Sequence, residues 1–166
     1  MLVVARLEPL KRIDLVIRAI AHVSSPVRLV IVGDGSLRME LQRETAALNL
    51  GHRVAFAGSL WGDPVADLYA GALGVVYAPF DEDYGYVTLE AFLSSKPVVT
   101  CTDSGGTLEF VVDGHNGFVC APDAPSLGAA ISTLAADRTL AARLGANGLA
   151  RAREITWDGV VERLLG

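Results

Sequence analysis

Two glutamates near the middle of the chain have a spacing that suits the binding of a sugar beside a phosphate. Glu82 and Glu90 lie in the segment 79–97, with Gly85 between them. A helix that begins near Gly85 or Tyr86 would hold Glu90 in its second turn and leave Glu82 on the preceding loop. The free N–H groups of such a helix favour a phosphate, and carboxylates accept hydrogen bonds from hydroxyls. We therefore expect a site that binds a phosphate and sugar hydroxyls next to each other.

Two basic residues near the start of the chain are candidates for neutralising that phosphate. Arg6 and Lys11 both lie between the first apolar run and the first helical pattern. A bound phosphate is stabilised by fixed cations, N–H dipoles or a divalent metal. The alternative is that both side chains are ordinary solvated residues of a surface loop.

The acidic run around Glu82 raises the question of a metal. Asp81 and Asp83 flank this glutamate, and carboxylates are the ligands that hard divalent cations prefer. Acids directed at a phosphate site would compete with the phosphate, so we expect both aspartates to face solvent. We predict no metal and no other cofactor.

Six short apolar runs indicate the sheet that would position these residues. They are rich in valine and isoleucine and continuously apolar, which is typical of parallel strands buried on both faces. The runs are 2–5, 28–32, 54–57, 74–78, 97–101 and 117–120. Helical periodicity lies between them. This alternation predicts a single α/β domain, a Rossmann-like doubly wound parallel sheet of about six strands with helices on both faces.

The helices are assigned from their caps and apolar positions. Ser36 is expected to cap a helix that carries Leu37, Leu41 and Leu48. Other helical patterns cover 13–20, 65–72, 107–112, 125–134 and 140–144, and a last short amphipathic piece covers 160–165. Ligands of doubly wound sheets bind beyond the carboxyl ends of the strands. The candidate residues all follow predicted strand ends, so one edge of the sheet should collect them.

Several segments, in a fixed order, resemble the retaining family-four glycosyltransferases of the GT-B superfamily, the glycosyl transferases group 1. Glu82 and Glu90, with seven residues between them and Ala-Phe-Leu after them, resemble that family's signature. The other segments are 5–12 (ARLEPLKR), 31–35 (IVGDG), 105–109 (GGTLE), 113–117 (DGHNG) and 155–157 (ITW). They match only the family's C-terminal half. Residues 1–166 are therefore expected to form the nucleotide-sugar donor-binding domain, with the N-terminal acceptor domain outside this chain.

The resemblance implies transfer of a hexose from a nucleoside diphosphate sugar to an unknown acceptor, with retention of the anomeric configuration. It implies that Arg6 and Lys11 bind the diphosphate, that Glu82 contacts the donor sugar or acts near the reacting carbon, and that Glu90 binds the ribose hydroxyls. A simpler interpretation of Glu90 is an acid favoured by the helix dipole.

The resemblance also assigns backbone contacts. It implies that the diphosphate binds the N–H groups of Gly85, Tyr86 and Val87, and that the nucleobase binds the backbone of Gly58, Ser59 and Leu60. Gly105 and Gly106 let the backbone approach a ligand closely, or else form a strand-to-helix turn that needs positive φ.

Composition excludes several other classes. The chain has 166 residues, 51% hydrophobic and 20% charged, with a net charge of −5. This composition is globular, and the charge argues against a nucleic-acid surface. The turn 33–35 lacks the third glycine of a dinucleotide fingerprint, which argues against NAD. His22, His52 and His115 lie apart and are expected on the surface, and the two cysteines, 101 and 120, are expected to stay reduced.

Location and activity follow as expectations. We find no signal-peptide pattern and no apolar run near the ~20 residues of a membrane span, so we expect a cytoplasmic protein. Peripheral membrane association of the full-length protein stays open, but not through this domain. We expect the isolated domain to bind nucleotide without turnover. The alternatives are a non-catalytic nucleotide-binding module and another GT-B relative, such as a sugar-nucleotide epimerase or a phosphorylase.

Overall fold

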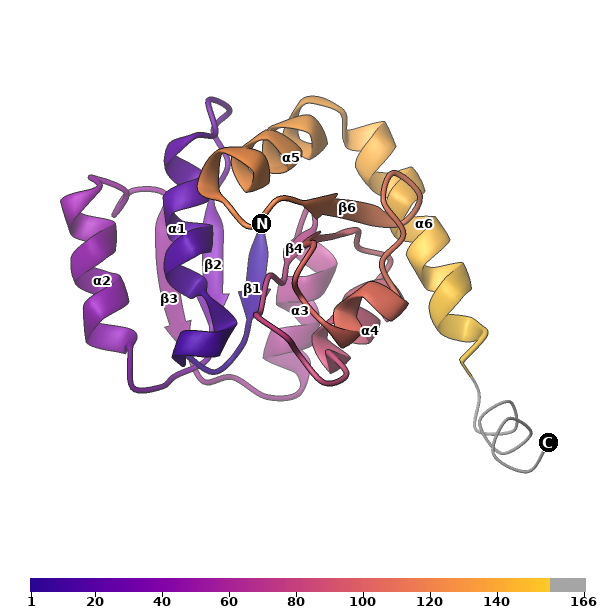
Figure 1. Ribbon diagram of the computed structural model, residues 1–166, viewed down its shortest axis with the longest axis horizontal. Coiled ribbons are helices and arrows are strands. Elements are labelled where there is room, and N and C mark those ends of the chain that lie inside the picture. Colours follow the sequence, from indigo (N-terminus) through magenta and orange to yellow (C-terminus); the bar gives the residue numbers. More distant parts are fainter. Residues whose placement is uncertain (156–166) are drawn as a thin grey trace.

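The computed structural model describes residues 1–155, which form a six-stranded parallel sheet between two layers of helices (Figure 1). The strands are β1 (Leu2–Val4), β2 (Leu29–Val32), β3 (Val54–Gly58), β4 (Val75–Val76), β5 (Val98–Cys101) and β6 (Gly117–Cys120). The helices are α1 (Ile13–Ala21), α2 (Arg38–Ala47), α3 (Asp63–Gly71), α4 (Tyr86–Leu93), α5 (Ala124–Ala136) and α6 (Arg138–Arg153). Two 3-10 turns, η1 (Pro9–Lys11) and η2 (Gly106–Glu109), follow β1 and β5. The predicted piece over 160–165 and residues 156–157 lie outside the described residues.

The strand order β3-β2-β1-β4-β5-β6 confirms the predicted doubly wound sheet. The chain runs outward from β1 in one direction and then outward from β4 in the other. β1 and β4 are neighbours, paired at Leu2 and Val75. Their boundary is the point where the direction of winding reverses, and in such sheets a ligand crevice opens beyond the strand ends there.

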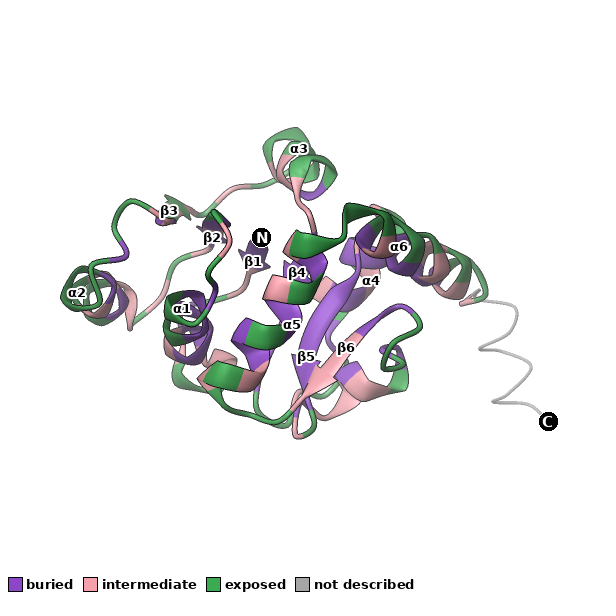
Figure 2. Cartoon of the chain, turned by 90° about the horizontal axis from the view of Figure 1, so that it is seen from above, coloured by how far each residue is buried: buried purple, intermediate pink, exposed green. Residues whose placement is uncertain are grey.

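Burial on both faces of the sheet explains the apolar runs of the inner strands, but the prediction is wrong for edge strand β3, where Ala55 and Ala57 are exposed. Leu2 and Val3 are neighbours in β1, and each is 1% exposed, but they belong to different hydrophobic clusters. Val3 packs in the cluster of α1 and α5, while Leu2 packs in the cluster that holds Tyr69 of α3 and Phe92 of α4. Figure 2 shows buried residues along β5 and on the sides of the helices that face the sheet, with exposed residues on the outer sides of the helices.

Two local predictions are wrong. Ser36 does not cap α2, because the helix begins at Arg38 with Leu37 as its N-cap, and the Ser36 hydroxyl instead donates to Glu8 Oε2 at 2.7 Å. The predicted helix over 107–112 is only the 3-10 turn η2, which ends at Glu109.

Two further expectations concerned the state of the cysteines and the presence of a membrane-spanning segment. Cys101 and Cys120 are register partners on β5 and β6, and both are free thiols. Burial raises the pKa of the Cys101 thiol to about 12. Within residues 1–155, no helix has both the length and the apolar character needed to cross a membrane.

Candidate functional site

The structure brings Lys11 and Glu82 together at the boundary between β1 and β4. Lys11 is the last residue of η1, and Glu82 lies on the loop between β4 and α4. Lys11 Nζ donates to Glu82 Oε2, and the hydroxyl of Tyr77 donates to the same oxygen at 2.6 Å. The side chains of Lys11 and Glu82 are 19% and 18% exposed. A cation and an acid that are 71 positions apart in sequence therefore form one partly buried pair.

The surroundings of Glu82 keep its carboxyl group ionised. Burial by itself would raise its pKa, but the hydrogen bonds from Lys11 and Tyr77, together with the charge of Lys11, lower the pKa below its ordinary value. Burial and the bond to Glu82 raise the pKa of the Tyr77 phenol. Tyr77 is therefore a neutral donor at physiological pH, and Glu82 is an acceptor.

Glu90 occupies a second position at the same edge of the sheet. It lies in the second turn of α4, where it is exposed, and the hydroxyl of Tyr69 donates to its Oε2 at 2.7 Å. Both residues line a groove of about 820 Å³. Of the predicted site residues, this groove collects Arg6, Ser59, Leu60, Val87 and Glu90. Arg6 is exposed and lines the groove, whereas Lys11 binds Glu82.

The start of α4 follows Glu82 closely in the chain, and Val87 in its first turn lines the groove. Gly85 is its N-cap with φ of 76°, so the predicted beginning of this helix is confirmed. None of the side chains described in residues 1–155 caps its first N–H groups. The hydroxyl oxygens of Thr88 and Thr107 are buried without a hydrogen-bond partner in the described chain. Free N–H groups at a helix start attract anions.

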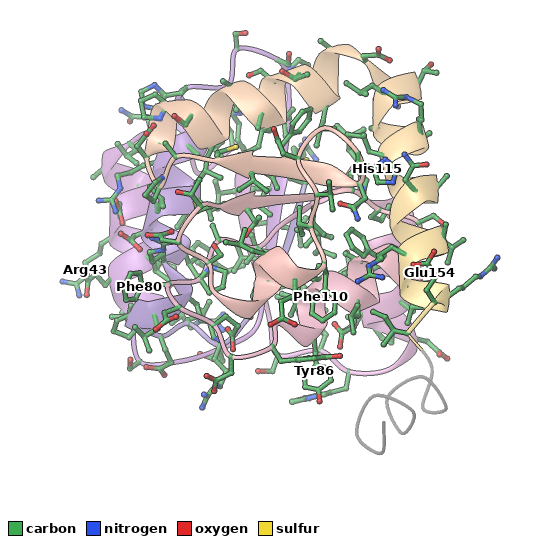
Figure 3. All side chains as sticks on the ribbon, turned by 45° about the vertical axis from the view of Figure 1, so that its right-hand side comes forward. Arg43, Phe80, Tyr86, Phe110, His115 and Glu154 are labelled. Carbon is green, nitrogen blue, oxygen red and sulfur yellow. The ribbon has the colours of Figure 1, made fainter. Side chains whose placement is uncertain are left out.

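Three aromatic rings hold the loop that leads into α4. Tyr84 packs against Tyr86 at 4.8 Å between ring centroids and against Phe110 at 5.0 Å. Tyr86 is 71% exposed, whereas Phe110, the C-cap of η2, is buried, and both lie on the same side of the molecule (Figure 3). These contacts fix the backbone of Tyr86 while its ring remains at the surface.

Gly105 and Gly106 lie against the backbone of the Glu82 loop. Gly105 pairs with Glu82 in an isolated parallel bridge, and the N–H of Gly106 donates to the Glu82 carbonyl at 2.6 Å. A Cβ atom at Gly106 would lie 2.2 Å from the Asp83 carbonyl oxygen. Gly105 has φ of 61°, which supports the turn interpretation of this pair. A ligand contact at either glycine stays a prediction.

Arg12 is a site residue that sequence analysis missed. Its guanidinium donates two hydrogen bonds to the Asp103 carboxylate, at 2.7 and 2.8 Å. It also donates to the carbonyl oxygens of Ala78 and Pro79, at 2.9 and 2.7 Å. The available signal was a second basic residue directly after Lys11. That signal could not identify a partner 91 positions away.

Three more side chains were missed. Tyr69 and Tyr77 lie in apolar patterns and were assigned to the core, although their hydroxyls bind the two glutamates. Trp61 lines the groove and is 80% exposed. Asp81 and Asp83 are exposed, as predicted. Gly58 ends β3 with φ of 74°, directly before the groove residue Ser59.

The ion pair of Asp103 predicts a loss of stability in acid. The hydrogen bond from Arg12 and, after the opposing effect of burial, its charge lower the pKa of Asp103 below the ordinary value of 3.8. A carboxyl group whose pKa is lower in the folded chain contributes stability above its unfolded pKa, and this contribution is lost as pH falls through the folded pKa. We expect the difference in unfolding free energy between wild type and Asp103→Asn to shrink below about pH 4. Urea denaturation across this range measures the difference, and a pH-independent difference would contradict the expectation.

An α/β fold with its candidate site at the reversal of winding is an architecture that nucleotide-binding domains use. The chain belongs to the glycosyl transferases group 1 family, whose model matches residues 1–151. It is 33% identical to a D-inositol 3-phosphate glycosyltransferase of Acidothermus cellulolyticus, over 99% of this chain and 39% of the relative.

Solved structures have the same fold. A crystal structure of the Anabaena protein HepE in complex with UDP and glucose superposes with a TM-score of 0.88 and 29% identity, over 98% of this chain and 47% of that one. The C-terminal domain of the Francisella tularensis protein LpcC has a TM-score of 0.82 at 21% identity, over 92% of this chain and 84% of that one. The chain thus spans less than half of the first two of these relatives.

Proposed function

We propose that this chain is the donor-binding domain of a retaining, family-four hexosyltransferase that uses a nucleoside diphosphate sugar. The observation that carries the proposal is the Lys11–Glu82 pair beside the uncapped start of α4. Family membership and the UDP bound in the HepE structure support it. We further propose that an N-terminal domain in the full-length protein supplies the acceptor.

In this proposal the diphosphate lies at the start of α4. The N–H groups of Gly85, Tyr86 and Val87 point to it, and Lys11 and Arg6 approach it as cations. As the bond to the sugar breaks, negative charge grows on the leaving oxygen, and these fixed donors stabilise it without a metal. Glu90, held by Tyr69, accepts hydrogen bonds from the ribose hydroxyls.

Glu82 already accepts a hydrogen bond from Lys11. A bound diphosphate would compete with Glu82 for the ammonium group. We infer that the donor turns Lys11 partly toward the phosphate and leaves Glu82, still bound by Tyr77, to accept a bond from the hexose. NMR of the product formed by the full-length enzyme gives the anomeric configuration of the transferred hexose, and this measurement tests whether the configuration is retained.

Calorimetry on the 166-residue chain with UDP, GDP and ADP tests the binding proposal. We expect one of them to bind, with an affinity that a chelator does not change. Glu90→Gln should weaken that nucleotide about tenfold, because hydrogen bonds to a charged acceptor contribute about 1.5–3 kcal/mol. Inorganic pyrophosphate, which has no ribose, should bind both proteins equally.

Glu40→Gln is the matched control, since Glu40 is an exposed glutamate in the first turn of α2. If it weakened the nucleotide as much as Glu90→Gln, the ribose assignment would be wrong. Binding of nucleotide by this chain together with failure of the full-length protein to transfer any sugar would favour a non-catalytic module.

A further inference from the structure

Arg12 has a backbone conformation that only a strong local constraint would maintain. Its φ of 48° and ψ of 43° lie in the left-handed region, and it is both the C-cap of η1 and the N-cap of α1. A side chain other than glycine is strained there. Such strain persists where the surroundings over-determine it, and it clusters at functional sites.

The side chain of Arg12 provides this constraint. The guanidinium donates two hydrogen bonds to Asp103 and one to each of two carbonyl oxygens in the loop after β4. It is only 18% exposed, and Phe80 covers it at 5.8 Å. Figure 3 shows Phe80 at the α1 side of the molecule, well away from Tyr86. A planar guanidinium suits this combination of a bidentate carboxylate and an aromatic ring.

The contacts of Arg12 join the three segments that meet at the site. Ala78 and Pro79 begin the loop that carries Glu82. The Asp103 carbonyl accepts the N–H of Asp81 at 3.0 Å, so the same loop is tied to the end of β5 as well. The N–H of Phe80 donates to the Leu10 carbonyl at 2.8 Å, directly before Lys11.

We propose that Arg12 is a positioning residue that holds Lys11 and Glu82 at the distance needed to receive a diphosphate. It acts through its neighbours and does not itself contact the ligand, because its hydrogen bonds already go to Asp103 and the two carbonyl oxygens. This inference rests on the proposed function, since it assigns Arg12 a part in the same site. It gives a role to Arg12, which lies in the resembling segment 5–12 but was assigned no role there.

Two substitutions separate positioning from stability. Arg12→Gly and Arg12→Ala both remove the guanidinium, but only glycine relieves the left-handed backbone. We expect Arg12→Gly to melt at a higher temperature than Arg12→Ala. Both should weaken inorganic pyrophosphate by the same factor, about tenfold. If Arg12→Ala, the variant with the lower melting temperature, bound pyrophosphate more weakly than Arg12→Gly, the inference would be overturned.

The titration of the Glu82 carboxyl group tests the inference without any ligand. Carbon-13 NMR of this carboxyl should show its pKa rising in Arg12→Gly, because Lys11 no longer reaches it. An unchanged Glu82 titration overturns the positioning role even if the chain binds diphosphates. A changed titration in a protein that binds no diphosphate supports the positioning role and contradicts the proposed function.

Arg53→Ala is the matched control. Like Arg12, Arg53 donates hydrogen bonds to backbone carbonyl oxygens. Its three acceptors are Val23, Ser25 and Val27, before the start of β2. It should lower the melting temperature and leave both the Glu82 titration and pyrophosphate affinity unchanged.

Asp103→Asn distinguishes positioning from direct binding. If Arg12 contacted the diphosphate itself, freeing it from Asp103 would strengthen pyrophosphate binding. Positioning predicts the opposite, a severalfold weakening, because the neutral amide holds the guanidinium less well. Stronger binding by Asp103→Asn would overturn the inference.

Discussion

Replacing Lys11 with alanine is expected to weaken nucleoside diphosphate binding by about 100-fold, as measured by calorimetry on the 166-residue chain. The Lys11 side chain is 19% exposed, so its contact with a phosphate would be poorly screened. Hydrogen bonds to charged groups contribute about 1.5–3 kcal/mol. The loss should lie at the upper end of this range, because removal of the ammonium also leaves the Glu82 carboxylate facing the phosphate.

Lys96 provides the control for this experiment, as the other lysine of the chain. Its ammonium donates to the Ala70 carbonyl at 2.8 Å, on the α3 side. Lys96→Ala should leave the affinity unchanged. In Lys11→Ala/Glu82→Gln we expect part of the affinity to return, because the uncompensated charge is gone. If Lys11→Ala bound nucleotide as well as wild type, the diphosphate would not lie beside this lysine.

Gly105→Ala is expected to lower the free energy of unfolding by about 3–5 kcal/mol, measured by urea denaturation. Two effects combine here. Gly105 has φ of 61°, and a Cβ atom would lie 2.5 Å from the Glu82 carbonyl oxygen. Relief of this clash requires the Glu82 loop to move, so the folded fraction should also lose affinity for the diphosphate.

Gly114→Ala separates the two effects. Gly114 has a similar φ of 68°, but a Cβ atom there would meet no atom of the described chain within 4 Å. This variant should lose only about 1 kcal/mol from the backbone conformation. Equal losses in the two variants would show that the close approach to Glu82 has no energetic importance.

The fold could be predicted because burial on both faces leaves a direct mark on the sequence. The inner strands of the sheet are short runs of mostly apolar residues, and in β1 Val3 packs in one cluster while Leu2 and Val4 pack in the other. Local predictions failed where a side chain forms a hydrogen bond with a residue that is distant in the sequence. Serine often caps helices, but the Ser36 hydroxyl donates to Glu8, and no residue near Ser36 in the sequence predicts this hydrogen bond.

The candidate site could be predicted only where residue type and spacing were informative. Glu82 and Glu90 were found from their place around Gly85, and Lys11 from its place after β1. Tyr77 and Arg12 were missed because each has an ordinary local explanation, a buried aromatic residue and a surface arginine. Their roles depend on contacts between loops that come together only after the sheet has formed.

The position of the site at the reversal of winding has a consequence for the folding of the whole domain. Lys11 follows β1 in the first half of the sheet, whereas Glu82 and Asp103 follow β4 and β5 in the second half. Neither half contains a complete set of contacts for a diphosphate. If the proposed function holds, a bound nucleotide would connect the two halves of the sheet, and nucleotide binding would then stabilise the contact between them.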